Sequence, residues 1–277
     1  MFKLIAILLM LLDHVAWIFA DVWGQEIYYI ARSIGRLSFP LFCYALARGY
    51  NRTSNFLNYF LRITIMAIGT QVVFETAFYI FDFPQYRFYN VLITFSLSLV
   101  VLAGMDLIEN SSLDMMINLR PLSSEGEVTK HFSPGGIRIP RWSGQVLGMI
   151  FILLALFLTR FIQPDYNFYG IATIVLFQRI DQNEIQYEKT LRKDLKKRRW
   201  TKYFLAFLLL NVLNVLPAYK DLNHYGTWIQ MWSVLAVFLF PLYEKEAKPS
   251  QAKRIFFYLF YPVHFVLLLW IKYILKI

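Results

Sequence analysis

The chain has 277 residues, of which 58% are hydrophobic and 18% aromatic, and its formal net charge is +10. Apolar runs near the roughly 20 residues that cross a bilayer recur along the sequence and leave no room for a sizeable soluble domain. The one cysteine, Cys43, excludes an intramolecular disulfide and a cysteine-rich metal site, and we expect a small packed thiol. Because most Lys and Arg residues lie in short connections between apolar runs, they indicate a membrane and exclude nucleic acid as the expected partner.

We predict an all-α fold, a polytopic transmembrane helix bundle that forms one integral membrane domain over residues 1–277, because helices satisfy their backbone groups in lipid. The nine predicted spans cover 3–21, 31–50, 57–81, 87–108, 144–162, 166–180, 202–217, 226–243 and 254–275. The first span resembles a signal peptide, but an ionisable pair interrupts its apolar core. We therefore expect a retained helix, with cleavage as the alternative.

Charge in the connections predicts the orientation of the spans. The even-numbered connections are rich in Lys and Arg, whereas the odd-numbered ones are short and mostly acidic or neutral. The positive-inside rule then places the N-terminus in the cytoplasm and the C-terminus outside, in a multi-pass protein of the cell membrane. The connections 109–143 and 181–201 become cytoplasmic loops. Residues 184–202 alternate acids and bases at helical spacing, which predicts a solvated helical extension near anionic headgroups.

The first span contains the adjacent pair Asp13 and His14, and ionisable residues within a spanning helix indicate function. Lys3 lies eleven residues before His14, which puts both on one helix face at depths about 16 Å apart. Neighbouring residues point about 100° apart, so we expect the partner that orients His14 to come from another helix rather than from Asp13. The alternative is that Lys3 only reaches the headgroups and that His14 is a buried, hydrogen-bonded core residue.

The second span begins with Arg32 and Arg36, which lie one turn apart on one face, and continues to Pro40. We expect Pro40 to kink this helix, because proline cannot donate a backbone hydrogen bond. Beside such a kink, an inward-facing Arg36 can hold an anion or a carbonyl oxygen. The alternative for both arginines is an anchor at the membrane interface.

Three more arginines lie at the predicted cytoplasmic ends of the second and third spans. Arg48 and Arg52 are four residues apart, and Arg62 is near the start of the third span. Guanidinium groups bind phosphates bidentately, so the three together predict a phosphate-binding mouth. The alternative is ordinary positive-inside charge.

Polar residues of the later spans complete the candidate site. Asn90 lies near the outer end of the fourth span, Asp165 opens the sixth, and His264 follows Pro262 in the last. Proline at that depth leaves a backbone carbonyl of the preceding turn without its hydrogen-bond donor, and we expect His264 to face the bundle interior. Asp165 has an alternative role, complementing the dipole of its helix.

The predicted depths bring His14, Arg36, Asn90 and Asp165 together from four helices. No set of three histidine ligands shares one depth, so we predict no metal site. His131 and His224 lie in predicted loops and receive no role.

Six stretches of the chain, in order, are similar to the TraX family of integral membrane proteins, which is associated with N-terminal acetylation of conjugative pilin. They are KLIAILLMLLDHV at 3–15, GRLSFPLFCYALARGY at 35–50, YFLRI at 59–63, NVLITFSLSL at 90–99, DYNFYGI at 165–171 and FFYLFYPVHFVLLL at 256–269. TraX is related to membrane acyltransferases that use acyl-CoA, whose first helix carries a basic residue, ten intervening residues and a histidine. Lys3 and His14 keep that spacing, with Lys in place of the more common Arg.

The resemblance implies that His14 is the catalytic residue and that acetyl-CoA, or another acyl-CoA, is the donor. We predict transfer of the acyl group to an amine or hydroxyl at the outer side, with His14 as general base. The remaining predicted catalytic residues are Asp13, Arg36 and Asn90 (the last two for the oxyanion), Asp165 (for the tautomer of His14) and His264 (for proton transfer or the channel wall). The predicted cofactor-binding residues are Lys3, Arg48, Arg52 and Arg62.

The acceptor stays open among a pilin N-terminus, a cell-surface glycan and a lipid headgroup, and membrane lipids are further partners. Two other function classes fit the same residues. A proton-coupled transporter of small molecules or lipids also places His, Asp and Arg within the membrane, and it would use proline-broken helices such as those at Pro40 and Pro262. A non-catalytic membrane scaffold would use the polar groups only for helix packing.

Overall fold

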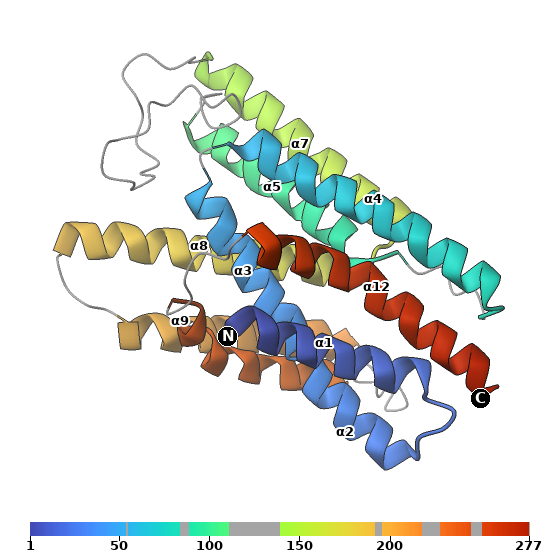
Figure 1. Cartoon of the computed structure of the whole chain (residues 1–277). Coiled ribbons are helices and arrows are strands. Elements are labelled where there is room, and N and C mark those ends of the chain that lie inside the picture. Colours follow the sequence, from blue (N-terminus) through green and yellow to red (C-terminus); the bar gives the residue numbers. More distant parts are fainter. Residues whose placement is uncertain are drawn as a thin grey trace. The chain divides into compact units, whose positions relative to one another are not determined.

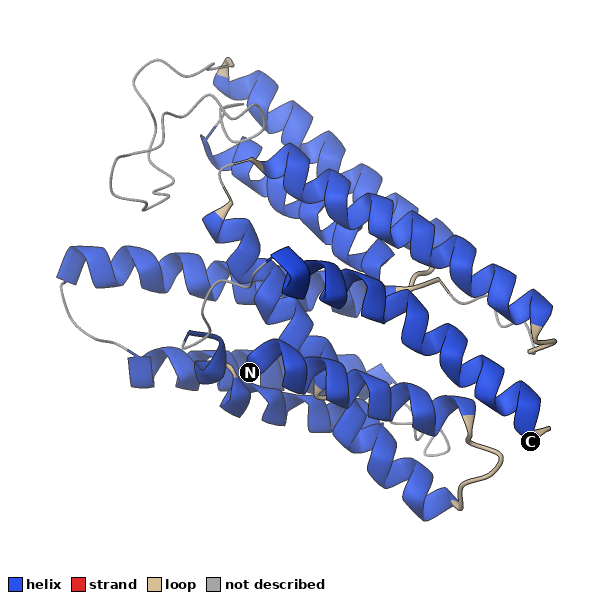
Figure 2. Cartoon of the chain, viewed as in Figure 1, coloured by secondary structure: helices blue, strands red, loops and turns tan. Residues whose placement is uncertain are grey.

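The structure, a computed structural model, describes residues 1–53, 55–83, 89–110, 139–191, 196–217, 228–244 and 251–276. Within these ranges every regular element is a helix (Figure 2), which confirms the predicted all-α fold. The helices are α1 (Phe2–Ile18), α2 (Gln25–Gly35), α3 (Ser38–Arg52), α4 (Phe56–Ile80), α5 (Val91–Asn110), α7 (Arg141–Ile162), α8 (Asn167–Leu191), α9 (Lys196–Val215), η2 (Gln230–Leu239), α11 (Pro241–Glu244) and α12 (Gln251–Leu275). Most of the predicted loop 109–143 lies outside the described residues.

Four of the described helices are long and apolar enough to cross a membrane: α4, α5, α7 and, from Ile255 onward, α12. Helix α7 exposes a stripe of large apolar side chains at helical spacing, namely Val146, Met149, Ile150, Leu153, Leu154, Phe157 and Phe161. Such a stripe would be costly in water and matches the requirement of lipid contact. These are the properties of an integral membrane protein.

Two of the predicted spans differ from the helices of the structure. The span predicted at 31–50 is broken, since α2 ends at Gly35 and α3 begins at Ser38. Pro40 therefore lies in the first turn of a new helix, where its missing N–H is not needed, instead of kinking one continuous helix. The span predicted at 226–243 consists of the 3-10 helix η2 followed by the short α11. A 3-10 helix rises further per residue than an α-helix, so the ten residues of η2 span a longer distance than ten residues of an α-helix would.

The chain divides into two compact units, which are described separately below. The first unit comprises residues 1–45, 69–87 and 188–277, and the second comprises residues 46–68 and 88–187.

In the first unit, α1 packs against α2 and α12 (Figure 1). Gly35 permits the contact with α2, because a Cβ atom at this position would lie 2.5 Å from the Cβ of Asp13. Helices α1 and α12 run in parallel: the Lys3 ammonium lies 5.7 Å from the centroid of the Phe257 ring at their starts, and Lys272 donates to the carbonyl of Ile18 (2.7 Å) near their ends. The two termini therefore lie at opposite ends of this unit.

In the second unit, α5 and α7 lie side by side (Figure 1) and approach closely at two glycines. A Cβ atom on Gly104 would lie 2.7 Å from the carbonyl oxygen of Gly148, so neither position has room for a side chain. Small residues at such crossings are typical of membrane helices, because association there depends on close packing. The core beside this contact includes Leu97 and Ala155.

Candidate active site

Two histidines from α1 and α12 meet in the first unit. The Nδ1 atom of His14 lies 2.7 Å from Nε2 of His264, and Nδ1 of His264 lies 2.7 Å from the backbone carbonyl oxygen of Phe260. The sequence placed both residues in the candidate site from separate spans, and the fold brings them into direct contact.

When both imidazole rings are neutral, the backbone carbonyl of Phe260 determines which ring nitrogens carry the protons. The Phe260 oxygen can only accept, so Nδ1 of His264 carries the proton and donates it. Nε2 of His264 is then an acceptor, and Nδ1 of His14 must be the donor in the contact between the two rings. The second ring nitrogen of His14, Nε2, is left with a free lone pair, which is the form that a general base requires.

Aromatic rings hold both imidazoles in place. The ring of Phe260 stacks on His264 with a centroid separation of 5.0 Å and an interplanar angle of 8°. Phe265 meets His14 edge-on at 5.5 Å and 87°. His264 is buried, whereas His14 is half-buried, and no other hydrogen-bond partner of His14 occurs in the part of the chain that the structure describes. A backbone hydrogen bond and ring stacking thus hold His264, whereas the side chain of His14 is partly exposed.

Asp13, the neighbour of His14, is directed toward α2. Its Oδ2 atom accepts a hydrogen bond from Arg32 Nη1 (2.5 Å), and its Oδ1 atom lies 3.7 Å from Nε of Arg36. The sequence left an interfacial anchor as the alternative for both arginines and grouped Arg36 with His14. In the structure, both arginines form ion pairs with the same carboxylate.

Asn90 and Asp165 lie in the second unit and take part in local contacts there. The Asn90 side chain donates to the carbonyl of Ala67 (2.9 Å) and accepts from the backbone N–H of Leu92 (3.0 Å), so it caps α5 and ties it to α4. The carboxylate of Asp165 accepts a hydrogen bond from the backbone N–H of Tyr166 (3.0 Å). The backbone N–H of Asp165 donates to the backbone carbonyl of Tyr89 (2.9 Å). Both residues thus organise the helix starts at one end of this unit.

The predicted cofactor-binding residues fall into two kinds. Arg52 and Arg62 are exposed, with the Arg62 guanidinium 5.8 Å from the ring centroid of Tyr59. Lys3 is half-buried beside Phe257. Arg48, by contrast, is buried and forms an ion pair with the fully buried Asp181 of α8.

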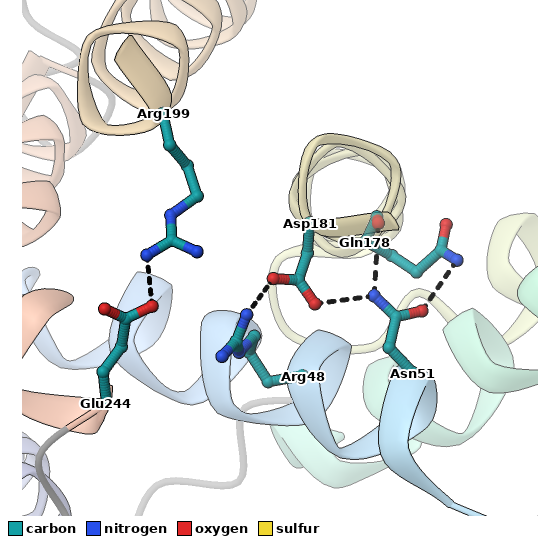
Figure 3. Close-up of polar contacts among 6 residues, drawn as sticks. All are labelled: Arg48, Asn51, Gln178, Asp181, Arg199 and Glu244. Atoms are coloured by element: carbon teal, nitrogen blue, oxygen red, sulfur yellow. Dashed lines mark hydrogen bonds and ion pairs between the residues drawn. The ribbon is translucent and has the colours of Figure 1, made fainter. Parts of the chain in front are cut away.

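Arg48 belongs to a polar network between α3 and α8 (Figure 3). Asn51 donates to the free carboxylate oxygen of Asp181 (2.8 Å), and Gln178 donates to Asn51 (3.0 Å). Nearby in the same unit, Tyr50 donates to Asp106 of α5 (2.6 Å). Sequence reasoning missed these partners, although Asp106, an acid on the largely apolar helix α5, was a signal that could have marked one of them.

A separate ion pair joins Arg199 of α9 to Glu244 of α11 in the first unit (Figure 3). Arg199 is buried, and its guanidinium lies 4.6 Å from the ring centroid of Trp200. The pair holds the two helices beside the aromatic cluster of Tyr44, Tyr203, Phe240 and Tyr243. We assign it a packing role.

Comparisons with known proteins identify a relative and a family of this chain. The chain is 35% identical over 106 residues to a protein named "Probable fimbrial assembly protein FimC, serogroup H1" from Dichelobacter nodosus, a match that covers 36% of this chain and 43% of that protein. No solved structure is similar to the chain. The family model described as "TraX protein" matches residues 1–272, nearly the whole sequence. The chain therefore belongs to the TraX family.

Proposed function

We propose that this TraX-family protein is an acyl-CoA-dependent membrane acyltransferase, in which His14 acts as general base for an acceptor amine or hydroxyl. The observation that carries the proposal is the chain of contacts from His14 through His264 to the carbonyl of Phe260, which leaves Nε2 of His14 unprotonated. Such a positioned base typically accelerates a proton transfer by 10²–10⁴-fold.

The proposed reaction needs no redox partner. The acceptor nitrogen or oxygen attacks the thioester carbonyl carbon of acetyl-CoA while Nε2 of His14 takes its proton. The tetrahedral oxyanion then collapses, the carbon–sulfur bond breaks, and the CoA thiolate leaves and is protonated by His14. The charge that forms on His14 between these steps is shared with His264, whose Nε2 accepts from Nδ1 of His14.

The CoA phosphates require cations, and exposed guanidinium groups suit them best. In the first unit, which contains His14, Lys3 keeps this proposed role with its single ammonium charge. Arg48 is a weaker candidate, since Asp181 already neutralises it. Of the two residues expected at the oxyanion, Asn90 already uses its amide within the second unit, whereas Arg36 lies close to the residue before His14.

For the acceptor, the name of the relative from Dichelobacter nodosus, a fimbrial assembly protein, favours a subunit of a fimbria or pilus. The TraX resemblance points to the same class and to acetyl as the transferred group. We therefore propose a protein amine at the outer side as the acceptor, ahead of a glycan or a lipid headgroup.

The test is calorimetric titration of acetyl-CoA into the purified protein in detergent, for the wild type and the His14→Ala variant, followed by an assay of thioester hydrolysis. We expect saturable binding by both proteins and slow hydrolysis by the wild type alone. A well-folded wild-type protein that binds no acetyl-CoA would contradict the proposal. Substrate uptake by proteoliposomes without acyl-CoA would then support the transporter.

A further inference from the structure

Helix α4, which is long and apolar enough to cross a membrane, has a carboxylate on its exposed face. Glu75 is exposed, as are Val72 one turn before it (59%) and Tyr79 one turn after it (80%). Exposed apolar side chains therefore flank the carboxylate in both directions along the helix. Ionisable residues within a spanning helix are rare, and they normally face the bundle interior or an aqueous cavity. Glu75 departs from this rule and requires a partner.

The packing of α4 in the first unit keeps Glu75 on the outside. Phe74 and Phe78 are buried, and their rings meet Phe265 of α12 at centroid separations of 4.2 and 5.6 Å. Turning Glu75 inward would withdraw these rings from Phe265. The helix continues from Glu75 to Ile80 and rises about 7.5 Å over that distance, so the carboxylate lies below the end of α4.

Glu75 lacks a counter-charge in this fold. Its Oε1 atom accepts a hydrogen bond from the side-chain amide of Gln71 (3.1 Å), one turn earlier. Among the residues that the structure describes, Glu75 has no other hydrogen bond and no ion pair. An amide brings no positive charge, and a carboxylate exposed to hydrocarbon is costly until a cation neutralises it. The missing partner of Glu75 is therefore cationic.

Beside Glu75, α4 has a seam of the kind that packs against another helix. Four exposed residues alternate at spacings of three and four, the pattern of a helix–helix contact: Gly69, Val72, Thr76 and Tyr79. No heavy atom lies within 4 Å of a Cβ atom built on Gly69, so the seam is open there. The Thr76 hydroxyl donates to the carbonyl of Val72 (2.7 Å) and needs no further partner. Small residues let membrane helices approach closely, which a lipid headgroup would not require.

The position of Glu75 next to this seam selects the partner. In a pair of parallel helices, charged residues beside the seam form ion pairs with the facing helix and decide which helices associate. In a second copy of this chain, the residue that faces Glu75 would be Ile80, five residues further along, and its side chain offers no charge. A pair of copies would therefore leave both carboxylates without a cation.

We propose that the exposed face of α4 from Gly69 to Ile80 docks a membrane-spanning helix of another protein, which carries Lys or Arg at the depth of Glu75. The cation and the carboxylate would neutralise each other in a medium of low dielectric constant, where their attraction is stronger than in water. Because this face includes neither His14 nor His264, the inference does not depend on the proposed acyl transfer.

The first experiment measures the association of probe peptides with the full chain in phosphatidylcholine liposomes, without acetyl-CoA. Resonance energy transfer joins a label on the C-terminus of the chain to a label on the peptide. The two probes are synthetic Leu/Ala helices of about 20 residues that differ at one position, about five residues from one end, which is Lys in one and Leu in the other. We expect the Lys peptide to bind about tenfold or more tightly. Equal affinities would overturn the proposal.

Two further outcomes would assign this face of α4 to another occupant and would also overturn the proposal. If phosphatidylethanolamine in the liposomes abolishes the preference for the Lys peptide, the carboxylate binds a lipid ammonium group. If differently labelled copies of the chain associate without peptide and Glu75→Gln separates them, the face is an interface between copies.

Variants then assign the preference to Glu75. We expect Glu75→Gln to reduce the ratio of the two affinities to about one, and Glu75→Lys to favour a third peptide with Glu at the variable position. The matched control is Glu26→Gln, which removes another exposed acid of the first unit and should leave the ratio unchanged. A preference for Lys that survives Glu75→Gln, or that Glu26→Gln also removes, would contradict the role of Glu75.

Gly69→Leu tests the seam separately from the charge. A Leu side chain has room at this position of the fold, but it would hold a partner helix away from α4. We expect both peptides to bind about tenfold more weakly or less, at an unchanged unfolding temperature. Unchanged affinities would show that the carboxylate alone holds the peptide, and docking of a helix on this face would be wrong.

Discussion

The two units of this protein contain buried ionisable groups of opposite kinds. In the second unit, Arg48 and Asp181 neutralise each other, and Asn51 and Gln178 add hydrogen bonds around them. In the first unit, the contact between His14 and His264 leaves Nε2 of His14 with a lone pair, and Arg32 and Arg36 both form ion pairs with Asp13. An ion pair between a buried guanidinium and a buried carboxylate holds its helices together, whereas a ring nitrogen with a lone pair can take a proton from a ligand. We therefore propose a structural role for the pair of Arg48 and Asp181 and a chemical role for His14.

The largest expected effect tests the structural half of this comparison. Asp181→Ala leaves the buried Arg48 without its carboxylate, and breaking such a pair typically costs about 3–5 kcal/mol of unfolding free energy. Denaturation in detergent measures the loss. The control is Glu109→Ala, which removes the more exposed partner of Arg179 and should cost less than about 1 kcal/mol. Equal small losses would show that the network does not hold the second unit.

The double variant Arg48→Met/Asp181→Leu sharpens this test, because it removes both charges at once. Apolar replacements of a buried ion pair are often neutral or stabilising, so we expect stability close to that of the wild type. A double variant as unstable as Asp181→Ala would mean that the two charges do more for the second unit than neutralise each other.

The next effect concerns the partner of His14. His264→Ala removes the acceptor of the His14 Nδ1 hydrogen bond, so we expect acyl transfer to fall by roughly 10–100-fold, the range found when the partner that orients a metal-ligating histidine is removed. His264→Gln, whose side-chain oxygen can still accept that proton, should retain more activity and a pH–rate profile closer to wild type. If His264→Ala and His264→Gln lose the same activity at the same thermal stability, the proposal that His264 orients His14 is wrong.

Packing in the second unit provides an effect of intermediate size. A Cβ atom on Gly148 would lie 2.7 Å from Cγ1 of Ile108, so Gly148→Leu forces α5 and α7 apart. Overpacking of this kind costs about 1–3 kcal/mol. The matched control is Gly69→Leu in α4, where no heavy atom lies within 4 Å of the built Cβ. Equal unfolding temperatures for the two variants would contradict the close helix contact.

The smallest effect is expected at the exposed end of the first unit, where Lys272 donates to both carboxylate oxygens of Asp21 (2.7 and 2.8 Å). The hydrogen bond from Lys272 lowers the pKa of Asp21 below its usual value. Its contribution to stability is therefore present above the unfolded pKa of about 3.9 and is lost as the pH falls through the lower folded pKa. Because Asp21 is exposed, we expect only a few tenths of a kcal/mol. The contribution is measured by the unfolding temperatures of the wild type and Asp21→Asn between pH 3 and 6. Parallel plots of unfolding temperature against pH would contradict the expected contribution.

Sequence alone predicted the helical membrane fold, because apolar runs of spanning length can be recognised without partners. It also selected His14 and His264, since histidines within apolar helices are rare. It could not predict that these two residues touch, or that Arg48 meets Asp181, because pairing between distant helices depends on tertiary packing. The break at Arg36 and Leu37 was missed for a local reason: Pro40 was treated as a kink within a helix instead of the first turn of a new one.

The most direct test of the central claim compares acetyl-CoA turnover by the wild type and the His14→Asn variant in the same detergent. Asparagine can still donate a hydrogen bond to His264 but has no basic nitrogen in place of Nε2. We expect turnover to fall by about 100-fold or more at an unchanged unfolding temperature, while the control His224→Asn behaves as wild type. Wild-type turnover by His14→Asn would contradict the account and remove His14 from the mechanism.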